Sequence, residues 1–392
     1  MKKHLLIHYG EIGLKLGNKD YFVSKLTDAV KDRLKTEFGR NFVVKHSLSR
    51  LLISLDDDFD EERGIEVLKK IFGIKNFSFV FEGTPKIGKL GEEIWDKFPN
   101  FSESDSGAPQ SFKVKVKRSM KVPFTSVEME RGIGAFLLGK GLNMKVKLKD
   151  PDFTVHIELF NEKAFFSFKK YEGAGGLSPG TQGKLIATLS AGIDSPVAAY
   201  KMMRRGARVI FVHFHGYPYT DKDEMEQVQE LTEILGEYQT NTKLYLVPFG
   251  FIQKNISTNT EIPARVRTIL YRRMMLRIAE KICFKERAKG LITGDNFGQV
   301  ASQTPENIFA IHDVTTVPLF QPLIGFDKEE IIDVAKKIGT FEVSKLPCKE
   351  SCTMFMPKSP ELRAKIEELR ECEKNLPIEE WVLEAIREMK VD

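Results

Sequence analysis

The stretch Ser190-Ala191-Gly192-Ile193-Asp194-Ser195-Pro196 decides the fold of this chain. The largely apolar residues 185–189 come directly before it and predict a buried strand, while the residues after it have helical spacing. Ser195 can cap that helix, and Pro196 suits its first turn. Gly192 permits a tight turn and a close approach of the backbone to a phosphate. The stretch therefore predicts a strand, a short loop and a helix.

The same loop has the chemistry of a phosphate site. A helix N-terminus offers free N–H groups and the positive end of the helix dipole, and Ser190 and Ser195 add hydroxyl donors. Asp194 would repel a triphosphate unless Mg²⁺ lies between the two. The residues alone fit either a site for phosphate with Mg²⁺ or an ordinary strand–turn–helix junction.

Around the loop, strand-like and helical segments alternate regularly, which predicts a parallel sheet with helices on both faces. Ligands of such sheets bind at the carboxyl ends of the strands. Amphipathic helical sequence follows over 361–389. The predicted strands are 185–189, 208–213, 243–248 and 290–293, and the predicted helices are 195–205, 221–238, 264–287 and 327–338.

The first half of the chain carries the excess of positive charge. Residues 1–175 contain 31 Lys and Arg against 25 Asp and Glu, whereas residues 176–392 contain 29 against 30. Residues 111–149 hold ten basic and two acidic residues. Such a local field favours a polyanionic partner, although a run of charge is commonly just a solvated face.

Two lysine runs in this region alternate with period two, Lys113-Val-Lys115-Val-Lys117 and Lys145-Val-Lys147-Leu-Lys149. A strand would place the lysines of each run on one face and the apolar residues on the other. Between the runs, Thr125 and Glu128 resemble a capping box that opens a helix to about Gly139. We therefore expect a small α+β domain with a basic surface.

Other features limit the class of protein. No apolar run approaches the roughly 20 residues of a membrane span, and the N-terminus does not resemble a secretory signal. Four cysteines do not make a disulfide framework, so we expect a cytoplasmic protein with reduced thiols. The segment from Gly134 to Lys140 resembles a Walker A loop, but Gly141 replaces the Ser or Thr that binds magnesium, and we expect a helix there.

The decisive loop resembles the SGGxDS signature of PP-loop ATP pyrophosphatases, and further motifs are similar to one branch of them, the tRNA 4-thiouridine synthetases of the ThiI family. The similarity extends to about residue 360. Residues 112–158 resemble the THUMP domain of that family. The other matching segments are Val212-His-Phe-His215, Tyr271-Arg-Arg-Met-Met275, Thr293-Gly-Asp-Asn-Phe-Gly-Gln-Val-Ala-Ser-Gln303-Thr304 and Pro322-Leu-Ile-Gly-Phe-Asp327-Lys328-Glu329.

The resemblance implies an α/β protein with four parts. A ferredoxin-like domain over 1–58 and a THUMP RNA-binding domain over 59–168, both α+β, come first. A Gly-rich linker over 169–183 then leads to a Rossmann-like PP-loop domain with a parallel sheet over 184–392.

The resemblance also implies site residues. Asp194 is the acidic residue of the pyrophosphatase loop, and Lys328 resembles a lysine tied to activity. In an alternative interpretation some of the site residues have only structural roles: Leu189 and Phe214 belong to the core, and Arg272 pairs with a carboxylate. The ATP-binding positions are Thr188, Leu189, Ser190, Gly192, Ser195, His213, Phe214, Arg272, Gly294 and Gln303, and the RNA-binding positions are Lys113, Lys115, Lys117, Arg118, Lys145 and Lys147.

Ala191 departs from the family, which usually has a second glycine there. If this position needs a positive φ, alanine costs roughly 1 kcal/mol; otherwise it is harmless, which we favour.

The implied reaction is thiolation of uridine at position 8 of tRNA to 4-thiouridine. ATP would adenylate the uracil O4, and a cysteine persulfide would deliver sulfur. The family places this thiol at Cys352, in Cys352-Thr-Met-Phe-Met-Pro357-Lys358, and Cys348 could resolve the persulfide. A metal site at these two cysteines is the weaker alternative, so we expect none. Cys283 and Cys372 lie in helical sequence.

The implied partners are tRNA, a cysteine desulfurase as sulfur donor and a second copy in a homodimer, with no membrane. About 35 residues follow Lys358, too few for the rhodanese domain of some relatives, which leaves sulfur delivery and any role in thiamine synthesis open. Two alternative functions are a PP-loop ligase that amidates its substrate and an RNA-binding protein without catalysis.

Overall fold

The computed structural model describes residues 1–15, 17–99, 109–347, 355 and 357–392, and Cys348 and Cys352 therefore lie outside the described residues. The chain divides into two compact units, Met1–Leu177 and Ser178–Asp392. No helix of the described chain is long and apolar enough to cross a membrane.

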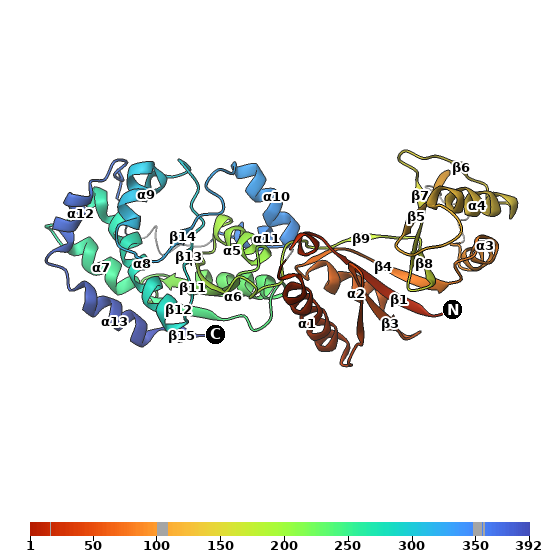
Figure 1. The fold of residues 1–392 in the computed structure, drawn as a ribbon. Helices are drawn as coiled ribbons and strands as arrows, with labels where there is room; N and C mark the ends of the chain where they lie inside the picture. The colour runs from red at the N-terminus through yellow and green to blue at the C-terminus, as the bar shows by residue number, and fades with distance from the viewer. Residues whose placement is uncertain (16, 100–108, 348–354, 356) are drawn as a thin grey trace. The chain divides into compact units, whose positions relative to one another are not determined.

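Unit 1 is built on one nine-stranded sheet with the order β2-β3-β1-β4-β8-β7-β5-β6, and β9 pairs with β4 (Figure 1). Strand β4 joins the two halves, because its first part pairs with β1 and its last residues pair with β8. The strands are β1 (Lys3–Tyr9), β2 (Val44–Ser47), β3 (Arg50–Leu55), β4 (Ile74–Gly83), β5 (Ser111–Arg118), β6 (Lys145–Val146), β7 (Phe153–Phe160), β8 (Lys163–Ser167) and β9 (Tyr171–Glu172).

Two separate cores form on this sheet. In the first, α1 (Lys19–Phe38) and α2 (Glu61–Lys69) bury their apolar faces against β1, β3 and β4. In the second, α3 (Ile87–Trp95) and α4 (Ser126–Gly139) cover β5, β7 and β8. The predicted capping box is confirmed, since Thr125 and Glu128 cap α4 reciprocally. The Walker-like segment lies within α4 up to Gly139, and Lys140 is the C-cap, so this segment is helical as expected.

The second lysine run is not the strand that the sequence predicted. Only Lys145–Val146 pairs, with the first two residues of β5, and β6 is the edge strand of the sheet. The chain then leaves the edge through Asp150, which has a φ of 42°, to reach β7 on the other side of β5. Consequently Val146 and Leu148 remain 54% and 78% exposed instead of lying on a buried face.

Unit 2 is the predicted β/α array. Its six-stranded sheet has the order β14-β13-β10-β11-β12-β15, and all pairs are parallel except the last. The strands are β10 (Lys184–Thr188), β11 (Arg208–His215), β12 (Leu244–Pro248), β13 (Leu291–Ile292), β14 (Leu319–Phe320) and β15 (Lys390–Val391).

Helices cover both faces of this sheet (Figure 1). The predicted C-terminal amphipathic sequence forms two helices, and Pro377 stands directly before the second of them. The helices of unit 2 are α5 (Asp194–Arg204), α6 (Asp223–Gly236), α7 (Gly250–Thr258), α8 (Arg267–Lys285), α9 (Pro305–His312), α10 (Lys328–Ile338), α11 (Phe341–Ser344), α12 (Ile366–Glu373) and α13 (Ile378–Glu388).

Candidate active site

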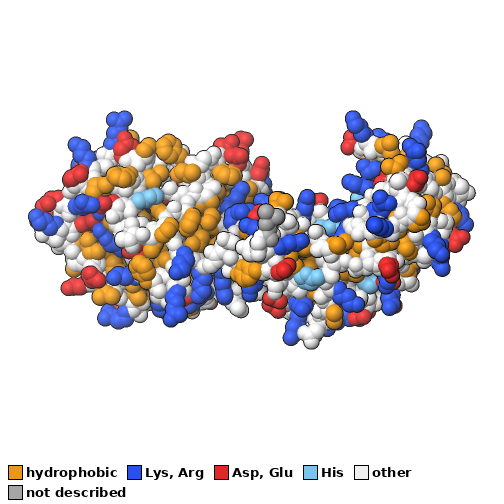
Figure 2. Space-filling view, in the orientation of Figure 1, with side chains coloured by type: hydrophobic (Ala, Val, Ile, Leu, Met, Phe, Trp, Pro, Cys, Tyr) orange, Lys and Arg blue, Asp and Glu red, His pale blue; other side chains and the backbone are white. Residues whose placement is uncertain are grey.

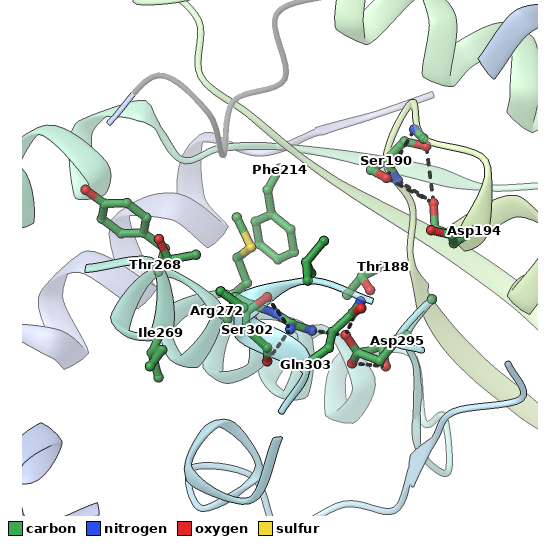
Figure 3. A pocket seen from close by; sticks show the side chains of 18 of the residues that line it. Thr188, Ser190, Asp194, Phe214, Thr268, Ile269, Arg272, Asp295, Ser302 and Gln303 are labelled. Atoms are coloured by element: carbon green, nitrogen blue, oxygen red, sulfur yellow. Dashed lines mark hydrogen bonds and ion pairs between the residues drawn. The ribbon is translucent and has the colours of Figure 1, made fainter. Parts of the chain in front are cut away.

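The loop between β10 and α5 is closed by its two serines. The backbone N–H of Ser190 donates to Ser195 Oγ at 2.9 Å, and the N–H of Gly192 donates to Ser190 Oγ at 3.3 Å (Figure 3). The expectation that Ser195 caps the helix is wrong: α5 begins at Asp194, so Ser195 lies inside the first turn and its hydroxyl points back to Ser190. Pro196 occupies the first turn, as expected.

The alanine in this loop causes no backbone strain. Neither Ala191 nor Gly192 has a positive φ, so the roughly 1 kcal/mol penalty does not apply to Ala191, which is 2% exposed. The tight contact comes from another strand end. A Cβ atom on Gly294 would lie 2.8 Å from Ser195 N and 2.9 Å from Ser195 Cα, so only glycine lets this segment pass so close to the start of α5.

The carboxylate of the loop is held from two directions. Lys328 Nζ donates to Asp194 Oδ1 at 2.6 Å, and Gln299 Nε2 donates to Asp194 Oδ2 at 3.2 Å. Lys328 is the first residue of α10, whose N-terminus is fixed by a capping box of Asp327 and Glu330. The sequence thus brings a cation to the loop from 134 residues away.

A cavity of about 470 Å³ lies at the carboxyl edge of the sheet beside this loop. It opens where β10, β11 and β13 end, the edge at which ligands of parallel sheets bind. Asp194 and all ten of the residues that the sequence analysis named for ATP line it: Thr188, Leu189, Ser190, Gly192, Ser195, His213, Phe214, Arg272, Gly294 and Gln303.

One wall of the cavity is an ion-pair network on a buried carboxylate (Figure 3). Asp295 is 4% exposed and pairs with Arg272, while Thr293 Oγ1 and Gln321 Nε2 donate to its other oxygen at 2.7 and 3.1 Å. Burial by itself would raise the pKa of Asp295, but the Arg272 charge and the hydrogen bonds outweigh it and lower that pKa. Arg272 also donates to the Ser302 carbonyl at 3.3 Å. Arg272 therefore pairs with a carboxylate, that of Asp295, and also lines the cavity, so the two alternative interpretations of this residue are compatible.

Three buried polar atoms that line the cavity lack a protein partner among the described residues. His213 Nδ1 lies 2.9 Å from the carbonyl oxygen of Leu189, so this nitrogen carries the proton and Nε2 is an unused acceptor. Burial lowers the pKa of His213 to about 4, which keeps the ring neutral. The other two atoms are Thr268 Oγ1 and Gln303 Oε1. Such orphaned groups fit a ligand that offers hydrogen bonds, as a nucleotide base does.

The first lysine run lies on β5 in unit 1. Val114 and Val116 are buried against α4, so Lys115 and Lys117 point to the open face of the sheet, and Lys113 is half-buried. Figure 2 shows Lys and Arg side chains gathered over the part of unit 1 that carries β5, β6 and α4.

The remaining basic positions differ in their environment. Arg118 is exposed, but its guanidinium donates to the Phe124 carbonyl at 2.6 Å. Lys145 and Lys147 are exposed at the edge of the sheet. The half-buried ring of His156 lies opposite Lys115 on β7, and partial burial with the neighbouring lysines lowers its pKa to about 4.

Comparisons with known proteins identify the family. A model described as "Thiamine biosynthesis protein (ThiI)" matches residues 180–378, a model of the ThiI ferredoxin-like domain matches 4–78, and a THUMP domain model matches 91–169. A probable tRNA sulfurtransferase of Caldanaerobacter subterraneus is 40% identical over 97% of both chains. The chain belongs to the ThiI family.

Further relatives of this ThiI-family chain are similar along their length. A probable tRNA sulfurtransferase of Thermus thermophilus is 39% identical, covering 100% of this chain and 94% of its own. A solved structure, described as a 4-thiouridine synthetase–RNA complex with bound ATP, is 33% identical with a TM-score of 0.85 and covers 100% of this chain and 99% of its own. The predicted fold class is therefore confirmed: ferredoxin-like and THUMP domains, followed by the PP-loop domain with its mostly parallel sheet.

The cysteines of this ThiI-family chain fall into two groups. Cys348 and Cys352, the proposed sulfur residues, lie outside the described residues. Cys283 is buried in α8, and Cys372 is half-buried on α12 against the core, as the sequence predicted. Within the described ranges, no group of three or more His, Cys, Asp or Glu side chains could hold a metal ion.

Several residues of the cavity were not identified from the sequence. Asp295, Ser302 and Thr268 line it, and Gln299 contacts Asp194. For Asp295 a signal was present, because it follows Gly294 just after the short strand β13, where the carboxyl-end rule predicts ligand contacts. Thr268 lies on α8, and no feature of the sequence marks that helical position.

Proposed function

We propose that the chain is an ATP-dependent tRNA sulfurtransferase that converts uridine at position 8 of tRNA to 4-thiouridine. The observation that carries the proposal is the convergence of the ten predicted nucleotide positions on one cavity, together with Asp194, which Lys328 holds in an ion pair. The solved relative described as an RNA complex with bound ATP supports both substrates.

The residues present fit ATP. The adenine would meet the neutral His213 ring with its unused Nε2, beside Phe214, and the phosphates would lie against the α5 N-terminus and Ser190. Lys328 would supply positive charge beside the loop, and Arg272 would supply it from the cavity wall at Asp295. We propose the ten named positions as the ATP site.

Mg²⁺ fits this site as a companion of the triphosphate rather than as a resident of a protein cage. Magnesium commonly binds through one or two carboxylates together with substrate phosphates, and Asp194 is the carboxylate in place. Bound there, the ion would neutralise phosphate charge. Two side chains from outside the loop orient Asp194, because Lys328 and Gln299 each donate to one of its oxygens.

The proposed chemistry has two stages. The uracil O4 attacks the α-phosphorus, the bond to pyrophosphate breaks, and the base loses its N3 proton. The terminal sulfur of a Cys352 persulfide then attacks C4, and the C4–O bond breaks to release AMP. Cys348 attacks Cys352 Sγ, the S–S bond breaks, and the sulfur that stays on C4 becomes the thiocarbonyl as N3 regains its proton. A thiol reductant reopens the resulting disulfide.

Further parts of the proposal concern partners and organisation. We propose that the exposed lysines of β5 and β6 bind RNA phosphates, that a cysteine desulfurase supplies the persulfide sulfur, and that the chain acts as a homodimer. The proposed domains are 1–58, 59–168 and 184–392, and the linker 169–183 joins the second of them to the third.

The test is nucleoside mass spectrometry of tRNA incubated with the protein, Mg-ATP and a cysteine desulfurase with cysteine. We expect 4-thiouridine with the natural chain, none with Cys352→Ala, and with Cys348→Ala a tRNA–Cys352 mixed disulfide in place of released 4-thiouridine. Cys372→Ala is the matched control, because this thiol is half-buried against a core. Full activity of Cys352→Ala, or no thiouridine from the natural chain, would refute the proposal.

RNA binding is tested by its salt dependence. Replacing Lys113, Lys115 and Lys117 by Ala should weaken tRNA binding and reduce the slope of log affinity against log salt by up to about 0.9 for each phosphate that is no longer neutralised. Lys31 and Lys35 on α1, both exposed, are the controls. An unchanged slope in the triple variant would exclude this surface.

A further inference from the structure

Two half-exposed tyrosines stand in the turn that follows β11. Tyr217 is 47% exposed and Tyr219 is 40% exposed, and the backbone N–H of Tyr219 donates to the Gly216 carbonyl at 2.8 Å to close the turn. Because Phe214 lines the cavity and β11 ends at His215, this turn leaves the same carboxyl edge of the sheet at which the cavity opens.

Each tyrosine carries a lysine over its ring. Lys222 Nζ lies 5.6 Å from the ring centroid of Tyr217, and Lys254 Nζ lies 5.4 Å from that of Tyr219. Both lysines are exposed. Aromatic faces interleaved with ammonium groups are the combination by which proteins hold single-stranded nucleic acid: bases stack on the rings and cations meet the phosphates.

Contacts link Tyr219 to the wall of the cavity. Its ring packs edge-to-face on Phe355 at 6.3 Å, and the Phe355 carbonyl accepts a hydrogen bond from the hydroxyl of Tyr271, a residue that lines the cavity, at 3.5 Å. Tyr219 is also fixed from beneath, since a Cβ atom on Gly250 would lie 2.7 Å from its Cδ2 atom. The ring is therefore a supported surface beside the cavity rather than a free side chain.

An unused polar group lies in the same turn. Thr220 is 8% exposed, and its hydroxyl has no hydrogen-bond partner among the described residues. Single exposed tyrosines are ordinary on protein surfaces. Here two exposed tyrosines are one residue apart, each has a lysine over its ring, and the unpartnered Thr220 hydroxyl lies in the same turn. Together these groups point to a ligand with a flat ring, negative charge and hydrogen-bonding edges.

We infer that Tyr217, Tyr219, Lys222 and Lys254 form a base subsite that stacks the target pyrimidine of the RNA, once extruded from its helix, beside the nucleotide cavity. The inference rests on the proposed function. An enzyme that modifies a base must take it out of the stack, which costs a few kcal/mol, and stacking on an aromatic ring returns part of that energy. The two lysines would meet the phosphates on either side of the extruded nucleotide.

The first test uses the product as its own probe, because 4-thiouridine forms covalent crosslinks with adjacent side chains under near-ultraviolet light. tRNA carrying 4-thiouridine at position 8 is irradiated with the full-length chain, and the crosslinked peptide is identified by mass spectrometry. We expect a crosslink within residues 216–222. Crosslinks confined to other segments would overturn the inference.

The second test is kinetic. Tyr217→Ala and Tyr219→Ala should each lower kcat/KM for tRNA thiolation by roughly 5- to 140-fold, the effect of losing about 1–3 kcal/mol of stacking per base at 1.4 kcal/mol per tenfold. The Phe variants keep the ring and should recover most of this loss. The affinity for ATP, measured without RNA, should be the same in all of them, which a merely structural role of the rings would not preserve.

Matched controls lie at the C-terminal end of α8, which is not part of the proposed subsite. Phe284 is 58% exposed, and Lys285 Nζ lies 5.4 Å from the ring of Tyr245. Phe284→Ala should leave kcat/KM unchanged, and Lys285→Ala should leave the salt slope of KM for tRNA unchanged, whereas Lys222→Ala and Lys254→Ala should reduce that slope.

The two proposals fail in different ways. If the natural chain thiolates tRNA but the Tyr→Ala variants do so with the natural kcat/KM, the subsite is refuted and the proposed function stands. If the natural chain makes no thiouridine, the proposed function fails first.

Discussion

Replacing Asp295 by Asn tests the charged wall of the cavity most directly. Asn has nearly the same volume but removes the negative charge that faces Arg272. Removing one partner of a buried ion pair typically costs about 3–5 kcal/mol. Arg272 is 22% exposed and keeps its bond to the Ser302 carbonyl, so we expect a smaller loss of about 2–3 kcal/mol.

The assay is hydrogen exchange with mass spectrometry on the intact chain. The chain has two compact units, so a single unfolding free energy is not well defined, whereas exchange reports local opening. Amides of α8 and of residues 291–303 should exchange faster by a factor that corresponds to a destabilisation of about 2–3 kcal/mol. ATP should also bind roughly two- to tenfold more weakly, because the Arg272 side chain is no longer held in place and must be ordered on binding.

Asp313→Asn is the matched control. Asp313 pairs with Arg273, the next residue on α8, and with the exposed Arg370, but it does not line the cavity. Its variant should speed exchange in α8 and leave ATP affinity unchanged. The reasoning is refuted if Asp295→Asn exchanges like the natural chain, or if the two variants weaken ATP binding equally.

Substitutions in the loop and in unit 1 test other parts of the structure. Gly294→Ala places a Cβ atom 2.8 Å from Ser195 N and should weaken ATP binding by roughly tenfold or more in an equilibrium titration, whereas Gly134→Ala, which meets no atom within 4 Å, should not. Lys328→Ala removes the cation from the loop carboxylate and should slow single-turnover thiolation by roughly 10- to 100-fold, while thermal stability changes little because this lysine is 42% exposed. Burial would raise the pKa of the Glu158 carboxyl, but the hydrogen bonds and charges of His8 and Arg50 lower it to about 2. Its stabilisation is therefore complete above its unfolded pKa of about 4.3 and is lost as pH falls towards 2, so acid should open β7 in the natural chain, and Glu158→Gln should already be opened at neutral pH.

Local pattern was enough to predict the frame of unit 2. The strand before Ser190, the helix after it and the regular spacing of the next strands all follow from short-range periodicity, and the strand-end rule then places the ligand edge. The predicted start of the helix was one residue too late, because Ser195 was expected to cap it. Ser195 has the hydroxyl of a capping residue, but this group bonds to Ser190 across the loop. A sequence cannot distinguish these two partners for one hydroxyl.

The parts that were missed depend on contacts between distant segments. Strand β4 was not predicted, because its apolar run is buried along most of its length and shows no alternation; it becomes a strand by pairing with β1 and β8. The run at Lys145 has a perfect alternation, yet it pairs over two residues, because the chain turns away from β5 through Asp150 to form β7 on the other side of that strand. Periodicity indicates what a segment could form, whereas the path of the chain through the tertiary structure decides how much of it forms.

The distribution of charge gives the two units different tasks. Unit 1 holds an excess of six basic residues, whereas unit 2 has one more acidic than basic residue. In unit 2 the cations at the cavity are already committed, since Arg272 pairs with Asp295 and Lys328 pairs with Asp194. Paired cations can orient a nucleotide but add little long-range attraction for RNA. We therefore propose that long-range attraction of the RNA comes mainly from the lysines of unit 1, and that recognition of one base comes from short-range contacts such as those of the Tyr217–Tyr219 turn.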